Sequence, residues 1–338
     1  MINKIYDNIR QTIKNNYKAV ISFVLIMILF TFEFPYYIEA PGGIIEINDR
    51  IEMKEKTESL GSFNLAYVTS IKATIPTLLY ATLNKDWDVL KKEEVIYENE
   101  TMEDEEYRSR LLLNEANNNA IIVAFKAANK EIQIANEHLF ITYVDSSSKT
   151  DLKIGDEILT VNNETIINKD QLDQIIEDKP VGEKITLTVM RGNKVANCYG
   201  VLQKIENKKI IGVVLSKTSD LSTNPEVKLK FRDSESGPSG GLMMALSIYD
   251  ALVDEDITYG KKIVGTGTID LNGNVGSIGG IEYKIKGAVK AGADLFLVPS
   301  GDNYNDAKKV IEENNYDLKL VAVSSFEEAL NKLKQLSY

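Results

Sequence analysis

Hydrophobic and polar positions divide the chain into segments with different patterns. Residues 19–32 are apolar except for Ser22 and Thr31, and this run predicts one continuous apolar helix. Between residues 137 and 204, short apolar runs separated by turn residues predict a small domain of strands with one helix. From residue 206 onward, strand patterns alternate with helical patterns, which is typical of an α/β domain.

Local spacing predicts the main elements of each segment. Ahead of the small domain, residues 63–71 read as a strand and residues 102–128 as a helix, whose start is indicated by Thr101 followed by Asp104. In the small domain we expect strands at 138–144, 158–161 and 185–190 and a helix at 169–176. In the last segment we expect strands at 227–231, 263–269, 295–298 and 318–323, and helices that start near residues 239, 282, 306 and 326.

The apolar segment has flanks of unequal charge. Lys4, Arg10, Lys14 and Lys18 precede it with one acid, Asp7, whereas Glu33, Glu39, Glu46 and Asp49 follow it. The positive-inside rule therefore puts the preceding side in the cytoplasm. We predict a single-pass signal anchor in the cell membrane, with the rest of the chain extracellular. A cleaved signal peptide or a buried helix is the alternative.

Composition excludes several functions. The 338 residues carry 39 Lys and Arg against 50 Asp and Glu, a net charge of −11, so we expect no nucleic-acid partner. One Cys and one His exclude a disulfide within the chain and any metal centre built on two imidazoles or several thiolates. No G-x-x-x-x-G-K-[ST] motif is present, so we expect neither ATP nor a cofactor.

A serine follows a turn in the α/β segment. The sequence S-G-P-S-G-G over 236–241 puts Ser239 directly after Gly237 and Pro238, at the head of a predicted helix. The unpartnered N–H groups and positive dipole of a helix start suit a developing oxyanion. Ser239 is therefore a candidate nucleophile for acyl transfer. The alternative is an ordinary N-cap, and this motif alone leaves both open.

A serine hydroxyl needs a base, and the single histidine, His138, lies about a hundred residues upstream. The predicted helix near residue 282 has Ile281, Ile285 and Ala288 on one face, with Lys284 on the same side. Burial can lower a lysine pKa from about 10.4 toward the working pH. Lys284 is a candidate general base, and the alternative is an ordinary solvated lysine.

These two segments together resemble the proteolytic domain of the Lon family. The resemblance is carried by T-G-T-I-D-L-N-G-N-V-G-S-I-G-G-I-E-Y-K over 266–284 and by G-P-S-G-G over 237–241, and it extends over about residues 210–336. Two positions depart from the family pattern. Gly240 stands where alanine is usual, and Ser236 stands where many ATP-dependent members have Asp.

The Lon resemblance implies roles for individual residues. Ser239 is the nucleophile, Lys284 is the general base, and Thr266 is a candidate to hydrogen-bond that lysine. Gly237, Pro238 and Gly240 are supporting residues of the serine loop.

The small domain resembles the second half of a bacterial PDZ domain. L-K-I-G-D-E-I-L-T-V-N-N over 152–163 and T-L-T-V-M-R-G over 186–192 carry this resemblance. It implies a groove that accepts an extended peptide by strand addition. Residues 135–140, ahead of the predicted first strand, replace the glycine-rich loop that receives a C-terminal carboxylate in the family.

The order of the segments resembles the membrane-anchored, PDZ-containing Lon-like serine peptidases of Gram-positive bacteria. It implies an ATP-independent serine endopeptidase that cleaves extracellular peptides or unfolded protein segments, with the PDZ-like domain presenting or gating the substrate. A homo-oligomer is a further partner consistent with the resemblance. The alternative is a catalytically inactive, membrane-tethered PDZ peptide-binding adaptor.

The predicted fold class is an α/β C-terminal Lon-type proteolytic domain, preceded by a small mixed α+β, β-rich PDZ-like domain and an N-terminal transmembrane helix. The predicted domains are a cytoplasmic tail at 1–18, the transmembrane signal anchor at 19–38, a membrane-proximal α+β region at 39–130, the PDZ-like domain at 131–205 and the Lon-type domain at 206–338.

Overall fold

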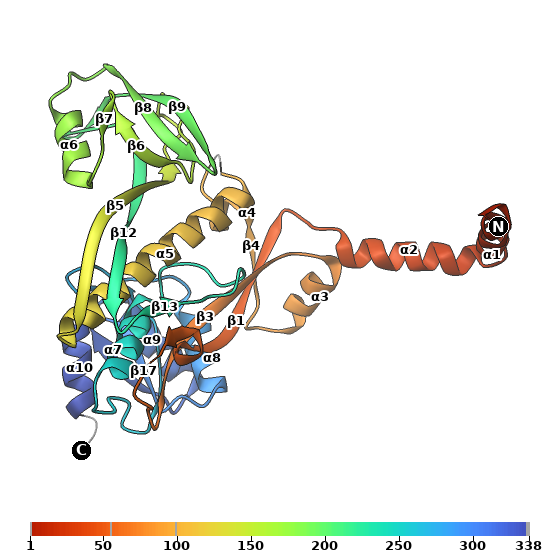
Figure 1. The fold of residues 1–338 in the computed structure, drawn as a ribbon. Coiled ribbons are helices and arrows are strands. Elements are labelled where there is room, and N and C mark those ends of the chain that lie inside the picture. Colours follow the sequence, from red (N-terminus) through yellow and green to blue (C-terminus); the bar gives the residue numbers. More distant parts are fainter. Residues whose placement is uncertain (1, 55, 99, 336–338) are drawn as a thin grey trace. The chain divides into compact units, whose positions relative to one another are not determined.

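The chain divides into two compact units. The computed structural model describes residues 2–54, 56–98 and 100–335, and Figure 1 follows the chain from red to blue. Unit 1 comprises Met1–Pro41 and Val68–Val95, and unit 2 comprises Gly42–Tyr67 and Ile96–Tyr338. Of the region predicted at 39–130, residues 39–41 and 68–95 fall in unit 1, and residues 42–67 and 96–130 fall in unit 2.

Unit 1 consists mainly of short elements around a small core. Its elements are α1 (Ile2–Asn15), α2 (Tyr17–Thr31), α3 (Ile75–Leu83), β4 (Asp88–Lys91), α4 (Lys92–Val95), the beginning of β1 (Tyr36–Glu46) and the end of β3 (Ser62–Lys72). β1 pairs with β4 in antiparallel register, Tyr37 opposite Leu90. Ile38, Ala73 and Ala81 are buried together beside Trp87.

The predicted transmembrane helix over 19–38 ends earlier than expected. Helix α2 stops at Thr31, and Phe32 is already extended, with ψ 114°. Pro35 cannot continue a helix, and Tyr37 and Ile38 are buried strand residues, 5% and 0% exposed. Over the ranges that the structure describes, no helix is both long and apolar enough to span a bilayer.

The central sheet of unit 2 is formed by strands from both ends of the chain. Its order is β18-β17-β14-β3-β1, with β14 (Lys262–Gly265), β17 (Leu295–Pro299) and β18 (Lys319–Val323). β14 pairs in parallel with β3 on one side and with β17 on the other. Every residue of β17 is buried, as expected for a parallel strand that is covered on both faces.

Helices cover the two faces of this sheet. α5 (Met102–Ala127), α7 (Gly241–Leu252) and α10 (Phe326–Gln335) share one hydrophobic cluster with strand residues such as Phe63 and Leu297. α8 (Ile281–Lys290) and α9 (Asp302–Asn314) pack with the alternate strand residues, such as Val264 and Phe296. Shorter elements complete the layer, namely η1 (Ile47–Arg50), β2 (Ile51–Met53), β13 (Val227–Leu229), β15 (Thr268–Ile269) and β16 (Val275–Gly276).

A second sheet and one helix form the PDZ-like part of unit 2. Its order is β12-β5-β6-β8-β9, and β7 pairs with β6. The elements are β5 (Glu131–Val144), β6 (Glu157–Val161), β7 (Glu164–Thr165), α6 (Lys169–Glu177), β8 (Lys184–Arg191), β9 (Lys194–Val201) and β12 (Val213–Asn224), with a small hairpin of β10 (Gln203–Ile205) and β11 (Lys208–Ile210). Leu139, Leu172 and Leu187 belong to its separate core.

Two features of this sheet differ from the sequence prediction. β5 begins seven residues before the predicted strand at 138, so residues 135–140 lie within a strand and do not form a loop. β12 pairs with β5 along its whole length, so the sheet continues past the predicted domain boundary at 205. The pairing partner of an extended segment is fixed by contacts distant in sequence, which local periodicity does not report.

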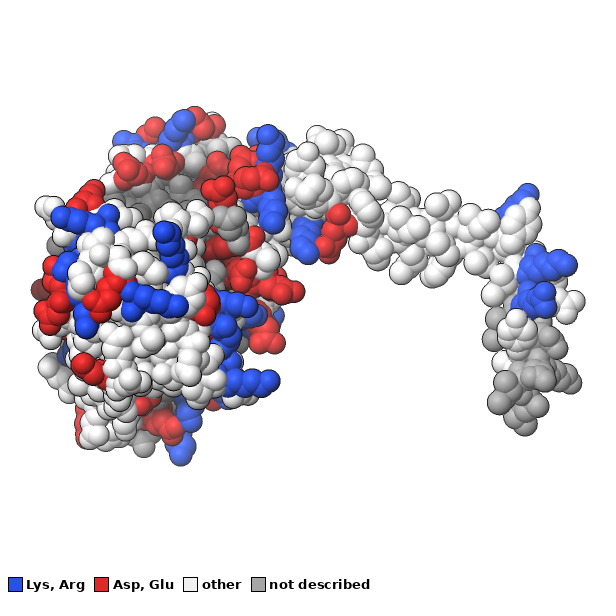
Figure 2. All heavy atoms as spheres, turned by 90° about the horizontal axis from the view of Figure 1, so that it is seen from above, with Lys and Arg blue, Asp and Glu red and all other residues white. Residues whose placement is uncertain are grey.

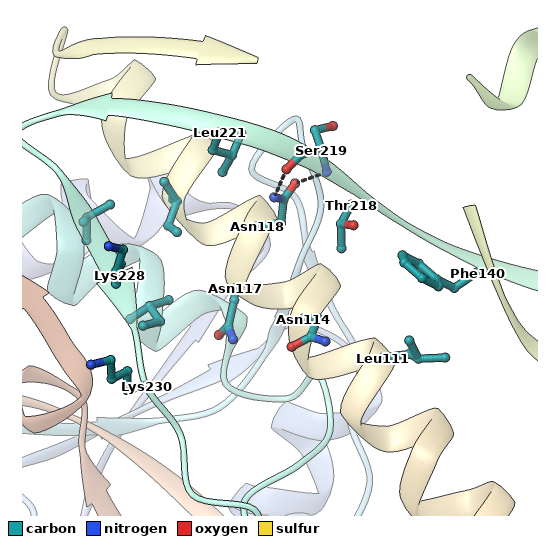
Figure 3. Close-up of a pocket in the computed structure, with 13 residues that line it drawn as sticks. Leu111, Asn114, Asn117, Asn118, Phe140, Thr218, Ser219, Leu221, Lys228 and Lys230 are labelled. Carbon is teal, nitrogen blue, oxygen red and sulfur yellow. Dashed lines mark hydrogen bonds between the residues drawn. The ribbon is translucent and has the colours of Figure 1, made fainter. Parts of the chain in front are cut away.

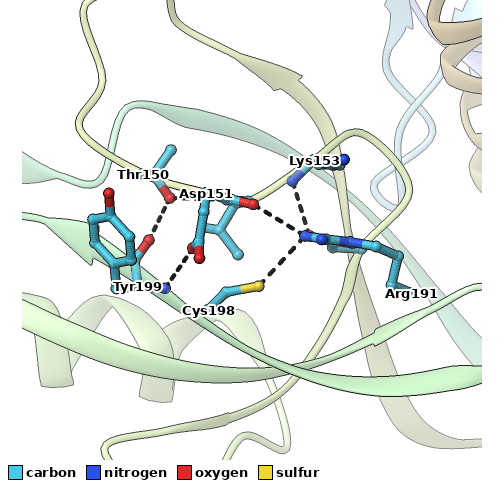
Figure 4. A network of polar contacts seen from close by, with 8 residues as sticks. Thr150, Asp151, Lys153, Arg191, Cys198 and Tyr199 are labelled. Atoms are coloured by element: carbon cyan, nitrogen blue, oxygen red, sulfur yellow. Dashed lines mark hydrogen bonds and ion pairs between the residues drawn. The ribbon is translucent and has the colours of Figure 1, made fainter.

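A polar network surrounds Arg191 in the PDZ-like part, and Figure 4 shows its contacts with Asp151 and Cys198. Asp156 is fully buried and accepts two hydrogen bonds of 2.7 Å from the Arg191 guanidinium. Arg191 also donates to the Asp151 carbonyl oxygen and to Cys198 Sγ. Cys198 is buried, and burial raises the pKa of its thiol, so this cysteine is a poor candidate for a nucleophile.

Candidate active site

Ser239 lies immediately before helix α7. The N-cap of this helix is Gly240, so the N-cap role considered for Ser239 belongs to its neighbour. The Ser239 carbonyl oxygen accepts a hydrogen bond of 2.8 Å from the Gly267 N–H. Within the described ranges, the Ser239 hydroxyl has no hydrogen-bond partner, and its side chain is partly exposed. A serine in this setting is available to a substrate.

The loop that carries Ser239 is held from two sides. Gly237 has a φ of +90°, a conformation that favours glycine, and its N–H donates to the Ser109 carbonyl oxygen of α5 at 2.9 Å. Glu235 accepts two hydrogen bonds from Arg50, of 2.6 and 3.0 Å, and one from the Arg232 N–H. These contacts restrict the positions that Ser239 can take.

Lys284 lies on the buried face of α8 and points toward the serine segment. Its side chain is 3% exposed, and its Nζ donates a hydrogen bond of 3.0 Å to Thr266 Oγ1. The Thr266 hydroxyl in turn donates to the Ser239 carbonyl oxygen at 3.1 Å. Two successive hydrogen bonds therefore join Lys284 to the backbone of Ser239, and the structure brings together three residues that lie far apart in sequence.

The environment of Lys284 favours the uncharged amine. Burial lowers the pKa of Lys284 to about 8, because an apolar environment solvates an ammonium group poorly. Thr266 is the only partner found for Nζ in the described part of the chain, and it supplies no negative charge. A neutral Lys284 that donates one N–H to Thr266 retains a lone pair able to accept a proton.

The backbone near Ser239 offers hydrogen-bond donors. No acceptor for the N–H groups of Ser239 or Gly240 occurs among the described residues. Beside them is a cavity of about 310 Å³, lined by Leu112, Glu115, Ala116, Asn119, Pro238, Thr268, Ile269, Asp270, Asn274, Val275 and Gly276. Pro238 thus contributes to the wall of a cavity next to the serine.

Gly240 leaves little room for a side chain. A Cβ atom at this position would lie 2.8 Å from Leu65 Cδ2, which is closer than normal contact. An alanine here therefore requires the Leu65 side chain to move, so a glycine at this position matches the packing against β3.

Several residues that position this site were not predicted from the sequence. They are Arg50 and Glu235 at the serine loop, Ser109 through its carbonyl, Asn119, which donates to the Ile269 carbonyl oxygen, and Asn303, which bonds the Ile278 backbone ahead of α8. Each bonds to a segment distant in sequence. The only available signal was the run Asn117-Asn118-Asn119 inside a predicted helix, where Asn is unfavourable.

The structure gives less support to a histidine base or to a metal site. His138 contacts Glu157 and Asp220 through its two ring nitrogens, and hydrogen bonding to Glu157 raises its pKa. These partners belong to the PDZ-like sheet. In the described part of the chain, no group of three or more His, Cys, Asp or Glu side chains is arranged to hold a metal ion.

Two parts of the chain match the models of known protein families. Residues 232–335 match the family model of the Lon protease (S16) C-terminal proteolytic domain, a serine peptidase family, and residues 120–198 match that of the PDZ domain. The first match contains Ser239, Thr266 and Lys284. The second begins within α5 and ends in β9.

Two curated proteins and one solved structure are similar to parts of the chain. The chain is 33% identical over 97 residues to Lon protease 2 of Bacillus subtilis, covering 29% of this chain and 16% of that protein. It is 32% identical over 117 residues to Lon protease 2 of Borreliella burgdorferi, covering 34% and 14%. The chain thus matches about one sixth or less of the length of these curated relatives. The PDZ domain of the SdrC-like protein from Listeria monocytogenes is 18% identical, covers 23% of this chain and 85% of that chain, and has a TM-score of 0.22.

Proposed function

We propose that this chain is a serine endopeptidase in which Ser239 is the nucleophile and Lys284 is the general base. The observation that carries the proposal is the buried Lys284 amine, which is hydrogen-bonded to Thr266 and through it to the backbone of Ser239. The match of residues 232–335 to a Lon proteolytic domain supports the same assignment. Thr266 orients the amine by accepting a hydrogen bond from it.

The proposed reaction proceeds by acyl transfer. Ser239 Oγ attacks the peptide carbonyl carbon while its proton passes to the neutral Lys284 Nζ. The N–H groups of Ser239 and Gly240 stabilise the oxyanion. Collapse of the tetrahedral intermediate breaks the C–N bond, and Lys284 returns the proton to the leaving amine. Water, deprotonated by Lys284, then attacks the ester carbonyl carbon, the C–O bond to Ser239 breaks, and Lys284 returns the proton to Ser239 Oγ.

The substrate class we propose is peptides or unfolded segments of proteins. The sequence has no phosphate-binding G-x-x-x-x-G-K-[ST] motif, so no nucleotide-driven unfolding is expected from this chain. The PDZ match suggests that the neighbouring domain binds peptides, and we propose that it presents or gates the substrate.

Cleavage without nucleotide is the direct test of this function. We expect the purified chain to hydrolyse unfolded casein in buffer that contains no ATP, and mass spectrometry of the products to show internal cuts. Addition of ATP and Mg²⁺ should leave the rate unchanged. If repeated preparations of folded protein produce no new peptides, the peptidase proposal is wrong and a peptide-binding adaptor becomes the better account.

We further propose that the N-terminal part attaches the chain to the cell membrane, with the proteolytic part outside. Fifteen residues form α2, none of them buried, and Lys18 is the only charged residue among them. Figure 2 shows most of this segment white, with Lys and Arg at its N-terminal end. An exposed apolar helix favours contact with a membrane or with apolar protein surface. The positive-inside rule orients the basic end toward the cytoplasm.

Membrane attachment is tested by fractionation. We expect the full chain expressed in a Gram-positive host to sediment with membranes, to resist extraction by sodium carbonate, and to be released only by detergent. A chain that starts at Phe32, and so lacks α1 and α2 but keeps β1, should stay in the supernatant. Recovery of both forms in the supernatant would argue against the anchor, and protease added to intact cells would report the side on which the C-terminal part lies.

A further inference from the structure

A second groove in unit 2 lies between α5, β12 and β13, outside the proposed catalytic residues (Figure 3). Its volume is about 510 Å³. Its lining consists of Leu111, Asn114, Asn117, Asn118, Ile121, Phe140, Thr218, Ser219, Leu221, Val227, Lys228, Leu229 and Lys230. We call it the β13 groove. Its walls combine apolar side chains with amides and two lysines, and they include no carboxylate.

One wall of the β13 groove is an unpaired strand edge. β13 pairs only with β2 in the described ranges, with Leu229 opposite Ile51. The Lys230 N–H donates to the Arg50 carbonyl oxygen, and backbone groups alternate in direction along a strand. The N–H and C=O of Leu229 therefore point away from β2, and no partner for either group occurs among the described residues.

The opposite wall carries amides at positions that suit a peptide backbone. The Asn118 side chain on this face of α5 donates a hydrogen bond of 2.8 Å to the Ser219 carbonyl oxygen and accepts one of 3.0 Å from the Ser219 N–H. Asn118 thus binds the main chain of one strand through two hydrogen bonds. Asn114 and Asn117 lie on the same helix beside it (Figure 3).

Asn117 has an unsatisfied acceptor. Its Oδ1 is buried and has no donor in the described part of the chain, and a buried polar atom without a partner costs free energy. A peptide N–H in the groove would supply that donor once the Asn117 side chain turns toward it, because Oδ1 is buried from solvent in this structure. The unpaired edge at Leu229 and this amide therefore both require main-chain partners of the kind that an extended peptide provides.

The charges at the groove indicate which peptide fits best. Lys228 and Lys230 line it, and their partners Glu226 and Glu52 form exposed ion pairs with side chains 55–65% exposed. Exposed pairs are weak, so both ammonium groups can exchange partners at little cost. A peptide carboxylate can replace Glu226 or Glu52 on these lysines, and no carboxylate lines the groove itself.

We propose that the β13 groove is an exosite that binds an extended, acidic stretch of polypeptide as an added strand on β13. Eight residues separate Lys230 from Ser239 along the chain, so a segment bound here lies on the strand that leads into the serine loop. The proposal depends on the proposed function only in identifying this polypeptide as the substrate.

The test measures binding to the full-length Ser239→Ala chain in detergent micelles by fluorescence anisotropy. The probes are a fluorescein-labelled peptide of about twelve Glu, Thr and Val residues, the same peptide with Lys for Glu, and the acidic peptide with alternate backbone nitrogens methylated. We expect the acidic peptide to bind about tenfold more tightly than the other two. Equal binding of the basic or the methylated peptide would overturn the exosite.

Variants then locate the binding. The double variant Lys228→Glu/Lys230→Glu and the single variant Asn117→Leu should each weaken binding of the acidic peptide about tenfold. The matched control is Lys308→Glu/Lys309→Glu on α9, whose lysines are similarly exposed and paired but lie outside the groove, and it should bind as the parent does. Unchanged binding in the groove variants would assign the peptide to another site and refute the proposal.

Binding and cleavage fail in different ways. Because Ser239→Ala removes the proposed nucleophile, the binding result does not depend on catalysis. Peptide binding together with an inactive wild-type chain would keep the exosite and reject the peptidase. Cleavage of casein with no binding in the β13 groove would keep the peptidase and reject the exosite. If both hold, the groove variants should raise KM for casein and leave a short peptide substrate unaffected.

Discussion

Ser239→Ala is expected to lower kcat for casein cleavage at least about 10³-fold, because it removes the only atom that can form the acyl intermediate in the proposed reaction. KM should change little, since the hydroxyl contributes little to ground-state binding. Single-turnover measurements of peptide products would quantify the loss. The thermal unfolding midpoint should remain close to the parent value, because this hydroxyl has no hydrogen-bond partner in the described ranges.

The matched control for this variant is Ser234→Ala, an exposed serine of the same loop. Its activity should equal that of the parent. If both serine variants retained full activity, Ser239 would not be the nucleophile. If both lost activity together with the folded loop, circular dichroism and the unfolding midpoint would reveal it.

Lys284→Met is expected to abolish cleavage to a similar extent, because methionine fills the same space but cannot accept a proton. In the parent chain, activity should rise with pH as the amine loses its proton, with a midpoint near the pKa of about 8 set by burial. This pH profile of kcat/KM is the measurement that identifies the base. Loss of activity in His138→Ala would instead indicate the histidine.

The same lysine has a predictable effect on stability. Its pKa is lower in the folded state than the ordinary value of 10.5, so the unfolded chain binds more protons between pH 8 and 10.5, and stability rises with pH across this window. Below pH 8 the buried charge costs up to about 3 kcal/mol. Lys284→Met should therefore be inactive and yet more stable than the parent at pH 7.

Lys290→Met is the matched control for the lysine variant. It makes the same substitution on the same helix at an exposed position, so both the pH profile and the unfolding free energy should remain those of the parent. Denaturant unfolding at pH 7 and pH 10 would separate the two variants. If the Lys284→Met chain is less stable than the parent at pH 7, the cost of burying the charge is not the largest contribution of this residue to the unfolding free energy.

The amino-acid sequence determined much of the local structure and the identity of the candidate residues. The strand at 63–71, the helix at 102–128 and the helix after residue 281 follow from periodicity and capping, because these signals act within a few residues. The motif around Ser239 and the apolar face around Lys284 identified both residues, and the matches to a Lon proteolytic domain and a PDZ domain agree with the predicted types.

Only the tertiary structure decided how these pieces combine. β3 pairs with β14 across about 200 residues of sequence. β12 extends the PDZ-like sheet beyond its predicted end. α2 ends at Thr31, four residues before Pro35, and β1 starts at Tyr36. Long-range packing also determines three features of the sites. They are the hydrogen bonds from Lys284 through Thr266 to Ser239, the hydrogen bonds from Arg50 to Glu235, and the unpaired backbone groups of Leu229. Such contacts form between residues that local spacing cannot relate, because burial and strand pairing are properties of the folded chain as a whole.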